Sequence, residues 1–280
     1  MNRYRLNKIF SQTIFYVLMI VVCAVIAFPF YWMINISLIP SSQIYRWPPI
    51  MATFKIVWQN YIQIFRVKPL AMWLINTVII ASLTTLLSIL VSVFGAYSLS
   101  RFNFKGKKII QIFILTVQMV PGVLLVVPIF IIFKQLHLIN QPAGLIIAFS
   151  TFSMPICVWM LKGFFDSIPI ELENAAYIDG CSTIGILFHI TLPLSLPGIV
   201  AVGMFSFLSA WNEYLIARIL IFSEKNYTVS LGLASFYGQF TIPWDQVLAA
   251  ATIITLPALF IFMFMQKYLL QGLTAGAIKE

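Results

Sequence analysis

Charged residues are scarce in this sequence, which has 17 Lys and Arg and eight Asp and Glu among 280 residues. They make up 9% of the chain, whereas soluble domains average about 25%. Hydrophobic residues make up 61%, which is more than a water-soluble fold can bury, so the composition predicts an integral membrane protein. The net charge of +9 does not indicate binding to nucleic acid, because the basic residues stand at the ends of apolar segments.

Cysteine and histidine are also rare, and their spacing argues against a disulfide framework or a metal site. Cys23, Cys157 and Cys181 are isolated from one another, and His137 and His189 are far apart. The sequence lacks a Gly-x-x-x-x-Gly-Lys-Ser/Thr phosphate loop, so we expect no cofactor in this chain and no ATPase activity of its own. An enzyme at membrane depth would need paired catalytic groups, and these are not found, so we expect a protein that is not an enzyme.

Six stretches reach the roughly 20 apolar residues that a membrane-spanning helix needs. They are 14–36, 74–99, 109–133, 144–163, 194–217 and 247–270. The first stretch is too long for the apolar region of a signal peptide, about 7–15 residues, so we interpret it as an uncleaved span. No soluble domain fits between the spans. The sequence therefore predicts an all-α protein with a single transmembrane domain over 1–280 and a core region of about 70–270.

Basic residues near the span ends predict the orientation of the chain in the membrane. They precede the first span, and four of them fall within 101–108, between the second and third spans. Because such residues favour the cytoplasmic side, we expect both termini to be cytoplasmic. The longer loop 37–73 carries four more basic residues on the opposite side, and we give them less weight in predicting the orientation because the loop is long. Its segment 40–70 is too polar and too rich in proline to span, and we expect it at the outer membrane interface.

The third and fifth predicted spans contain polar residues that are candidates for a transport path. Pro121 and Pro128 predict kinks in the third span. Gln118 lies nine residues after Ile109, about 13–14 Å along a helix and so near the bilayer midplane. Its side chain has two interpretations, a hydrogen bond between helices or a position in a transport cavity.

The fifth span carries Glu213, the only carboxylate within the six predicted spans. Ionisable groups at this depth usually face a cavity or a partner. A Trp ring beside amide and carboxylate groups suits a sugar, although Trp211 and Tyr214 equally fit an aromatic belt at the membrane interface. The predicted substrate-path residues are Gln118, Ser209, Trp211, Asn212 and Glu213.

The stretch 164–197 is a polar island between two apolar segments. Ser167 and Pro169 are typical of a helix start, and Gly180 is typical of a helix end. Acidic residues in the first turns are favourable at the positive end of a helix dipole. Half of the eight acidic residues fall here: Asp166, Glu171, Glu173 and Asp179. The sequence predicts a short helix over 169–180 with a small-residue surface that another protein could approach.

Ala175-Ala176-x-x-x-Gly180, followed after nine residues by Ile190-x-Leu192-Pro193, resembles the signature of ABC importer permeases. That signature begins with Glu, where this chain has Asn174 after Glu173. The alternative interpretation of this stretch is a structured loop that only covers the membrane face. In the family this loop is the coupling helix, which docks in a groove of a separate ATPase subunit. The resemblance implies a coupling role for Glu171, Glu173, Asn174, Ala175, Ala176, Asp179, Gly180, Ile190, Leu192 and Pro193.

Three further motifs resemble the binding-protein-dependent carbohydrate-uptake (maltose-type) branch of this family. They are Ala96-Tyr97 with Arg101 and Phe104-x-Gly106, the triplet at 211–213, and the tail beginning Gly272-Leu273-Thr274. The resemblance implies a type I ABC importer permease fold with a coupling loop, 164–193, and a cytoplasmic tail, 271–280. It also implies a bacterial-type plasma membrane and half of a translocation pathway for a sugar or oligosaccharide.

The resemblance also implies a set of partners. These are a dimer of ABC ATPase subunits that binds ATP and Mg, a second permease chain, an extracytoplasmic sugar-binding protein and membrane lipids. Two alternatives stay open from the sequence. One is an ABC permease for an amino acid, polyamine or phosphate, and the other is a secondary transporter.

Overall fold

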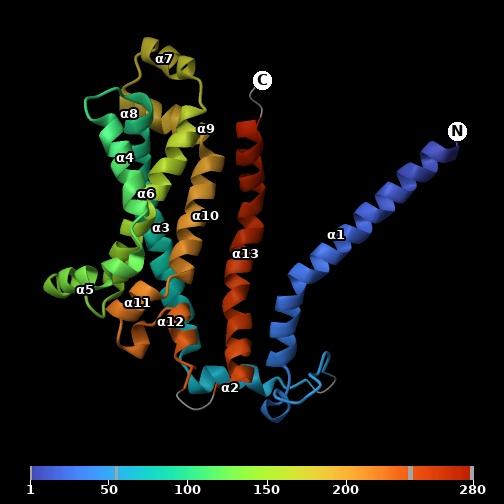
Figure 1. Cartoon of the computed structure of the whole chain (residues 1–280). Helices are drawn as coiled ribbons and strands as arrows, with labels where there is room; N and C mark the ends of the chain where they lie inside the picture. Colours follow the sequence, from blue (N-terminus) through green and yellow to red (C-terminus); the bar gives the residue numbers. More distant parts are fainter. Residues whose placement is uncertain (1, 54–55, 239–241, 278–280) are drawn as a thin grey trace. The chain divides into compact units, whose positions relative to one another are not determined.

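The computed structural model describes residues 2–53, 56–238 and 242–277, with side chains for 10–53, 56–238 and 242–267. The described residues form helices and turns without a strand, which confirms the prediction of an all-α fold. They divide into two compact units, one of 1–68 and 236–254 and the other of 69–235 and 255–280. Figure 1 shows the helices in chain order. The single domain over 1–280 stays a prediction, and residues 278–280 of the predicted tail lie outside the described residues.

The first unit contains α1 (Asn2–Ser37), the 3-10 turn Ser41–Gln43, α2 (Gln59–Val67) and the start of α13 (Trp244–Ala277). Side chains hold its irregular segment in place. Asn60 is buried and donates to the carbonyl oxygens of Ser37 and Ile39 at 2.9 and 3.2 Å. Ser41 Oγ donates to Asp245 Oδ2 at 2.6 Å. With nine residues, α2 is too short to span a membrane.

Three long helices form the core of the second unit: α3 (Leu70–Arg101), α6 (Pro142–Asp166) and α10 (Leu196–Asn212). Small polar side chains join them, because the Oγ atoms of Ser88 and Ser153 lie 2.6 Å apart and those of Ser153 and Ser206 lie 3.2 Å apart. A Cβ atom on Gly198 would stand 2.3 Å from Phe164 Cγ, so α6 and α10 approach each other closely there. Small residues and interhelical hydrogen bonds are the usual means of packing helices in lipid.

Shorter elements surround this core. They are α4 (Lys107–Gln118), the 3-10 turn Gly122–Leu125, α5 (Val126–Gln135), α7 (Ile170–Ile178), α8 (Thr183–Ile186), the π-helical turn Leu187–Thr191, α9 (Leu192–Leu194), α11 (Leu215–Leu220), the 3-10 turn Glu224–Asn226 and α12 (Val229–Ala234). Within the second unit, α7 and α8 lie at one end of the three-helix core, and α11 and α12 lie at the other (Figure 1).

Four of the predicted spans are confirmed as continuous helices long and apolar enough to cross a membrane. They correspond to Phe10–Ser37, Leu70–Arg101, Pro142–Asp166 and Trp244–Lys267. The other two predicted spans are broken into pairs of helices, and with each pair counted as one span the described residues have six candidate spans, the predicted number. The third is a pair, Lys107–Gln118 and Gly122–Gln135, bent by 93°, and the other pair, Thr183–Leu194 and Leu196–Asn212, is bent by 79°.

Local chemistry explains where these two spans break. Pro121 lacks the N–H that would continue α4, whereas Pro128 falls in the first turn of α5, where no donor is needed. The predicted span 194–217 ends early, because α10 stops at Asn212 and Glu213 is extended, with φ −69° and ψ 121°. Glu213 therefore lies at a helix break and not inside a span.

The end of α3 remote from α7 is tied to the segment that precedes α12. Trp73 Nε1 donates to the Glu224 carbonyl oxygen at 3.0 Å, and Asn76 Nδ2 donates to that of Lys225 at 2.7 Å. Thr77 Oγ1 accepts the backbone N–H of Val229 at 2.8 Å. The other end of α3 contacts α7, as described below. Helix α3 therefore runs from the α12 end of the second unit to its α7 end.

Candidate functional site

The helix α7 begins and ends through local backbone chemistry. Pro169 precedes its first residue, and Gly180 follows its end with φ +87°, a left-handed conformation that favours glycine. The N–H of Gly180 donates to the Tyr177 carbonyl oxygen at 3.1 Å, and the N–H of Cys181 donates to that of Ala176 at 2.9 Å. This pair of bonds is a Schellman motif and confirms Gly180 as the helix stop.

The predicted helix-start role of Ser167 is wrong. Its hydroxyl donates to the Phe164 carbonyl oxygen at 2.7 Å and so caps the end of α6. Proline at 169, one residue before α7, sets the chain direction instead.

Glu173 turns into the protein, although it belongs to a short helix with mostly exposed residues. It is 3% exposed, and Oε1 accepts hydrogen bonds from Arg101 Nε at 2.8 Å and from Thr191 Oγ1 at 2.9 Å. Its Oε2 accepts from the Tyr97 hydroxyl at 3.2 Å. Three donors from outside α7 therefore satisfy this buried carboxylate, as a buried charge requires.

Arg101 extends the same network to α6. Its guanidinium also donates to the Ile168 carbonyl oxygen and to Ser100 Oγ, each at 3.2 Å. Ser100 Oγ donates in turn to Asp166 Oδ1 at 2.6 Å, and Lys162 Nζ lies 2.5 Å from Asp166 Oδ2. The ends of α3 and α6 and the inner face of α7 are thus joined by charge-assisted hydrogen bonds.

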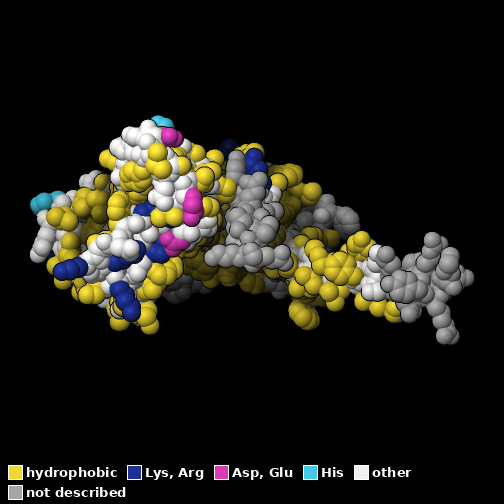
Figure 2. Space-filling view, turned by 90° about the horizontal axis from the view of Figure 1, so that it is seen from above, with side chains coloured by type: hydrophobic (Ala, Val, Ile, Leu, Met, Phe, Trp, Pro, Cys, Tyr) yellow, Lys and Arg dark blue, Asp and Glu magenta, His cyan; other side chains and the backbone are white. Residues whose placement is uncertain are grey.

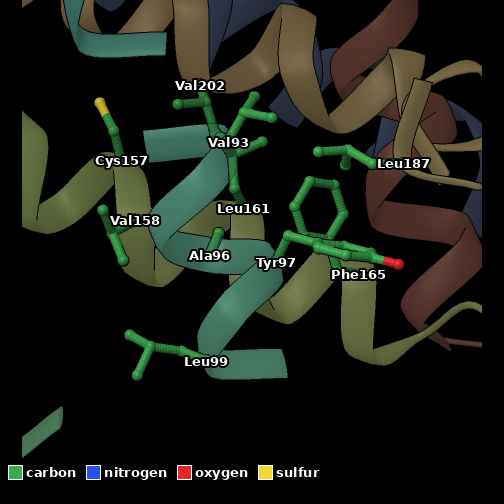
Figure 3. Packing of buried hydrophobic residues seen from close by; sticks show 10 residues of the cluster. All are labelled: Val93, Ala96, Tyr97, Leu99, Cys157, Val158, Leu161, Phe165, Leu187 and Val202. Atoms are coloured by element: carbon green, nitrogen blue, oxygen red, sulfur yellow. The ribbon is translucent and has the colours of Figure 1, made fainter. Parts of the chain in front are cut away.

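A buried apolar cluster lies directly beneath this network. Tyr97 packs edge-on against Phe165, with ring centroids 6.2 Å apart, and Leu187 of the π-helical turn packs with them (Figure 3). Leu192 is half-buried against the cluster. Of the other residues in this part of the predicted signature, Ile190 is half-buried and Pro193 is exposed. The Ile-x-Leu-Pro segment therefore connects α7 to the core.

The outer face of α7 is exposed and largely apolar. Ile178 is 88% exposed and Ile184, in α8, is 66% exposed. Ala176 is buried, whereas five other predicted coupling residues are exposed: Glu171, Asn174, Ala175, Asp179 and Gly180. Figure 2 looks onto this end and shows acidic side chains among hydrophobic ones, with Lys and Arg nearby. This face of α7 and α8 offers a partner an apolar surface with few charges.

A hollow of about 220 Å³ lies between α6 and α10. Most of its lining is apolar, and its polar side chains include the predicted path residues Ser209 and Glu213. Asn212 is exposed and lines a neighbouring hollow that shares Phe205 and Ser209 with the first. The structure therefore brings three of the five predicted path residues together.

Glu213 caps a helix as well as lining the hollow. Its Oε1 accepts the backbone N–H of Ile216 at 2.9 Å in the first turn of α11, and its carbonyl oxygen accepts Ser230 Oγ at 2.6 Å. An anionic group is favourable at a helix start. The carboxylate therefore stabilises the break between α10 and α11 at the wall of the hollow.

Two predicted path residues lie outside the hollow. Trp211 is 3% exposed and stacks on Phe207, with ring centroids 5.6 Å apart, so it packs within the helices. Gln118 Nε2 donates to the Phe152 carbonyl oxygen of α6 at 3.3 Å, which agrees with the interhelical interpretation. Only Phe152 of this pair lines the hollow.

The contacts of Tyr97 and Thr191 with Glu173 are not predicted by the sequence motifs. Tyr97 and Arg101 are four residues apart, so they share a helix face, and this spacing is a signal that the sequence does contain. Thr191 occupies the unspecified position of Ile-x-Leu-Pro, so no motif indicates it.

Residues 88–275, more than half of the chain, match the family described as "Binding-protein-dependent transport system inner membrane component". The chain belongs to this family. It is thus a multi-pass membrane permease and a transport subunit, not an enzyme. The predicted family is confirmed by relatives as well as by this match.

Two curated relatives cover most of the chain. The sulfoquinovosyl glycerol transport system permease protein SmoH of Agrobacterium fabrum is 37% identical over 256 residues, which are 90% of this chain and 88% of that protein. The trehalose/maltose transport system permease protein MalG of Thermococcus litoralis is 35% identical over 266 residues, 94% of each chain. Both similarities extend over nearly the whole permease.

A crystal structure of a bacterial ABC transporter involved in the import of the acidic polysaccharide alginate contains a similar chain. The TM-score is 0.81 at 19% identity, and the match covers 94% of this chain and 98% of that chain. The alginate transporter in complex with its alginate-bound periplasmic protein matches with a TM-score of 0.67 at 17% identity, covering 91% and 93%. These likenesses show the permease fold.

Proposed function

We propose that this permease forms half of the pathway of an ATP-driven importer for a sugar or oligosaccharide. Permeases named for sulfoquinovosyl glycerol and for trehalose and maltose are similar over nearly the whole chain, which supports a carbohydrate substrate. An extracytoplasmic binding protein delivers the sugar. A second permease chain supplies the other half of the pathway, and a dimer of ATPase subunits binds ATP and Mg.

The exposed face of α7 carries this proposal. Ile178 of α7 and Ile184 of α8 are exposed to solvent, while the opposite face of α7 is bonded through Glu173 to α3 and to the π-helical turn. An exposed apolar surface of this kind is typical of a protein interface. We assign it to the groove of the ATPase subunit.

The orientation follows from the same end of the bundle. Arg101 belongs to the basic cluster 101–108 and is bonded to Glu173, so this cluster and α7 share one end. Basic residues favour the cytoplasmic side, which supports a cytoplasmic α7. The basic residues before the first span support a cytoplasmic N-terminus in the same way, and six spans return the C-terminus to that side.

The hollow beside α10 is the proposed part of the substrate path in this chain. Ser209 and Glu213 supply hydroxyl and carboxylate groups to this hollow, and Asn212 supplies an amide to the neighbouring one. These groups can bond to sugar hydroxyls. The buried Trp211 does not add an aromatic platform in this conformation.

The test uses the complete transporter in liposomes, with its binding protein outside and ATP at the ATPase subunits. Wild type should import a disaccharide only when ATP is present. Ile178→Asp should lose the ATPase subunits and the uptake, because it places a charge in an apolar contact. Phe222→Asp is the matched control, since Phe222 is 60% exposed and lies between α11 and the 3-10 turn at the other end. Uptake without ATP, or uptake of an amino acid, polyamine or phosphate in place of sugar, would overturn the proposal.

A further inference from the structure

Glu173 is buried inside this chain, where a partner protein does not reach its carboxylate. Both carboxylate oxygens accept bonds from within this chain, at distances of 2.8 to 3.2 Å, and the side chain is 3% exposed. Glu171 and Asn174, its neighbours on α7, are both exposed. The outward groups of α7 and the inward carboxylate therefore belong to different interactions.

The three donors to Glu173 come from two elements that lead into the membrane-spanning helices. Tyr97 and Arg101 are on the last turns of α3, and Thr191 ends the π-helical turn before α9 and α10. Among the described residues, the hydrogen bonds and ion pair of Glu173 are the only ones that join an α7 side chain to α3. The Glu173 carboxylate thus connects α7 to the end of α3 and to the π-helical turn that leads into α9 and α10.

We propose that Glu173 is the positioning residue through which displacement of α7 reaches α3 and α10. This inference rests on the proposed function, in which an ATPase subunit moves α7. The Arg101 pair fixes the rotation of α7 about its own axis, because charge-assisted bonds are shorter and stronger than neutral ones and a buried site has a low dielectric. Without the pair, α7 turns on its two flanking segments and the displacement is lost locally.

This assignment explains how the chain tolerates Asn174 where the signature has Glu. Position 174 is exposed, so it faces the partner, and a neutral amide there suits the apolar outer surface of α7. The carboxylate needed for a rigid connection stands one residue earlier and points the other way.

The experiment compares Glu173→Gln with Glu171→Gln in the complete transporter. Both variants remove one negative charge from the first turn of α7, but only the first loses the Arg101 ion pair. In Glu173→Gln we expect the ATPase subunits to co-purify and hydrolyse ATP, while sugar imported per ATP falls about tenfold. Amide hydrogen exchange over 170–178 should rise by about tenfold, in line with the loss of a hydrogen bond to a charged group. Glu171→Gln keeps the Arg101 ion pair, so amide exchange over 170–178 should stay at the wild-type rate whatever the effect of this variant on docking of the ATPase subunits.

Thr191→Val provides a second, milder variant if Glu173→Gln does not assemble. It removes one of the three donors, keeps the side-chain shape and leaves the Arg101 ion pair in place, so sugar imported per ATP should fall only about threefold. If the assembled variants import as much sugar per ATP hydrolysed as wild type does, the inference is refuted. A smaller amount of assembled complex with unchanged sugar import per ATP would also refute it, because Glu173 would then have a structural role only. Failure of wild type itself to couple uptake to ATP would instead refute the proposed function.

Discussion

Gly180 provides a perturbation of α7 that leaves the packed core untouched. Its φ of +87° lies in the left-handed region, and a Cβ atom built there has no other atom within 4 Å. Gly180→Ala therefore introduces backbone strain without a clash. For a residue with a Cβ atom this strain is about 1–2 kcal/mol, which shifts a local equilibrium roughly 5- to 30-fold.

The strain acts on two hydrogen bonds that close α7. These are the bonds at 3.1 and 2.9 Å from the N–H groups of Gly180 and Cys181 to the carbonyl oxygens of Tyr177 and Ala176. When they open, Ile178 loses its position on the outer face of α7. We expect ATP-driven uptake to fall severalfold and the amides of 180 and 181 to exchange about 5- to 30-fold faster. Because this segment is exposed, the thermal unfolding midpoint of the complex should hardly change.

Two control variants separate backbone strain from other causes. Gly180→Asn should lose less ATP-driven uptake than Gly180→Ala, because Asn adopts the left-handed conformation more readily than Ala does. Gly106→Ala creates the same strain at φ +94°, also with no atom within 4 Å, but in the turn before α4. It should leave the uptake per ATP unchanged. Equal losses in all three variants, or wild-type exchange at 180 and 181 in Gly180→Ala, would refute the reasoning.

Three further predictions concern the rest of the unit. Gly198→Ala should lower the unfolding free energy by about 1–3 kcal/mol, seen in thermal melts, because its Cβ would overlap the Phe164 ring. Glu213→Gln can still accept the Ile216 N–H, so it should assemble normally but import sugar at least about threefold more slowly, whereas Glu213→Ala also loses the cap. Normal uptake by the Gln variant would limit Glu213 to capping. Asn140→Ala removes an Oδ1 that accepts two backbone N–H groups at 2.9 and 3.2 Å, so exchange at 222 and 223 should rise about tenfold, and unchanged exchange would contradict this.

Hydropathy predicts the continuous helices well and the broken ones poorly. The stretches within α1, α3, α6 and α13 are apolar for a full membrane width, and composition alone locates them. The stretch 109–133 is equally apolar, yet it bends by 93° near Pro121. The prolines predict a kink, but the angle depends on how α4 and α5 pack against other helices, which a single sequence does not encode locally.

The candidate site shows a similar division. Turn chemistry identifies Gly180 because its backbone conformation is a local property. The direction of Glu173 is not local, since it depends on the rotation of α7 against α3, and the sequence groups it with Glu171 as a helix-dipole residue. Trp211 likewise depends on tertiary packing, which places its ring on Phe207.

The continuity of α3 has a consequence for communication across the bilayer. This helix contains no proline, and Trp73 and Arg101 are separated by about 42 Å of uninterrupted backbone. One terminus holds the segment at 224–229, and the other holds Glu173. A displacement at one end of α3 therefore reaches the other end without an intervening joint, so in the proposed importer the ATPase contact at α7 acts on the same helix that holds the 224–229 segment.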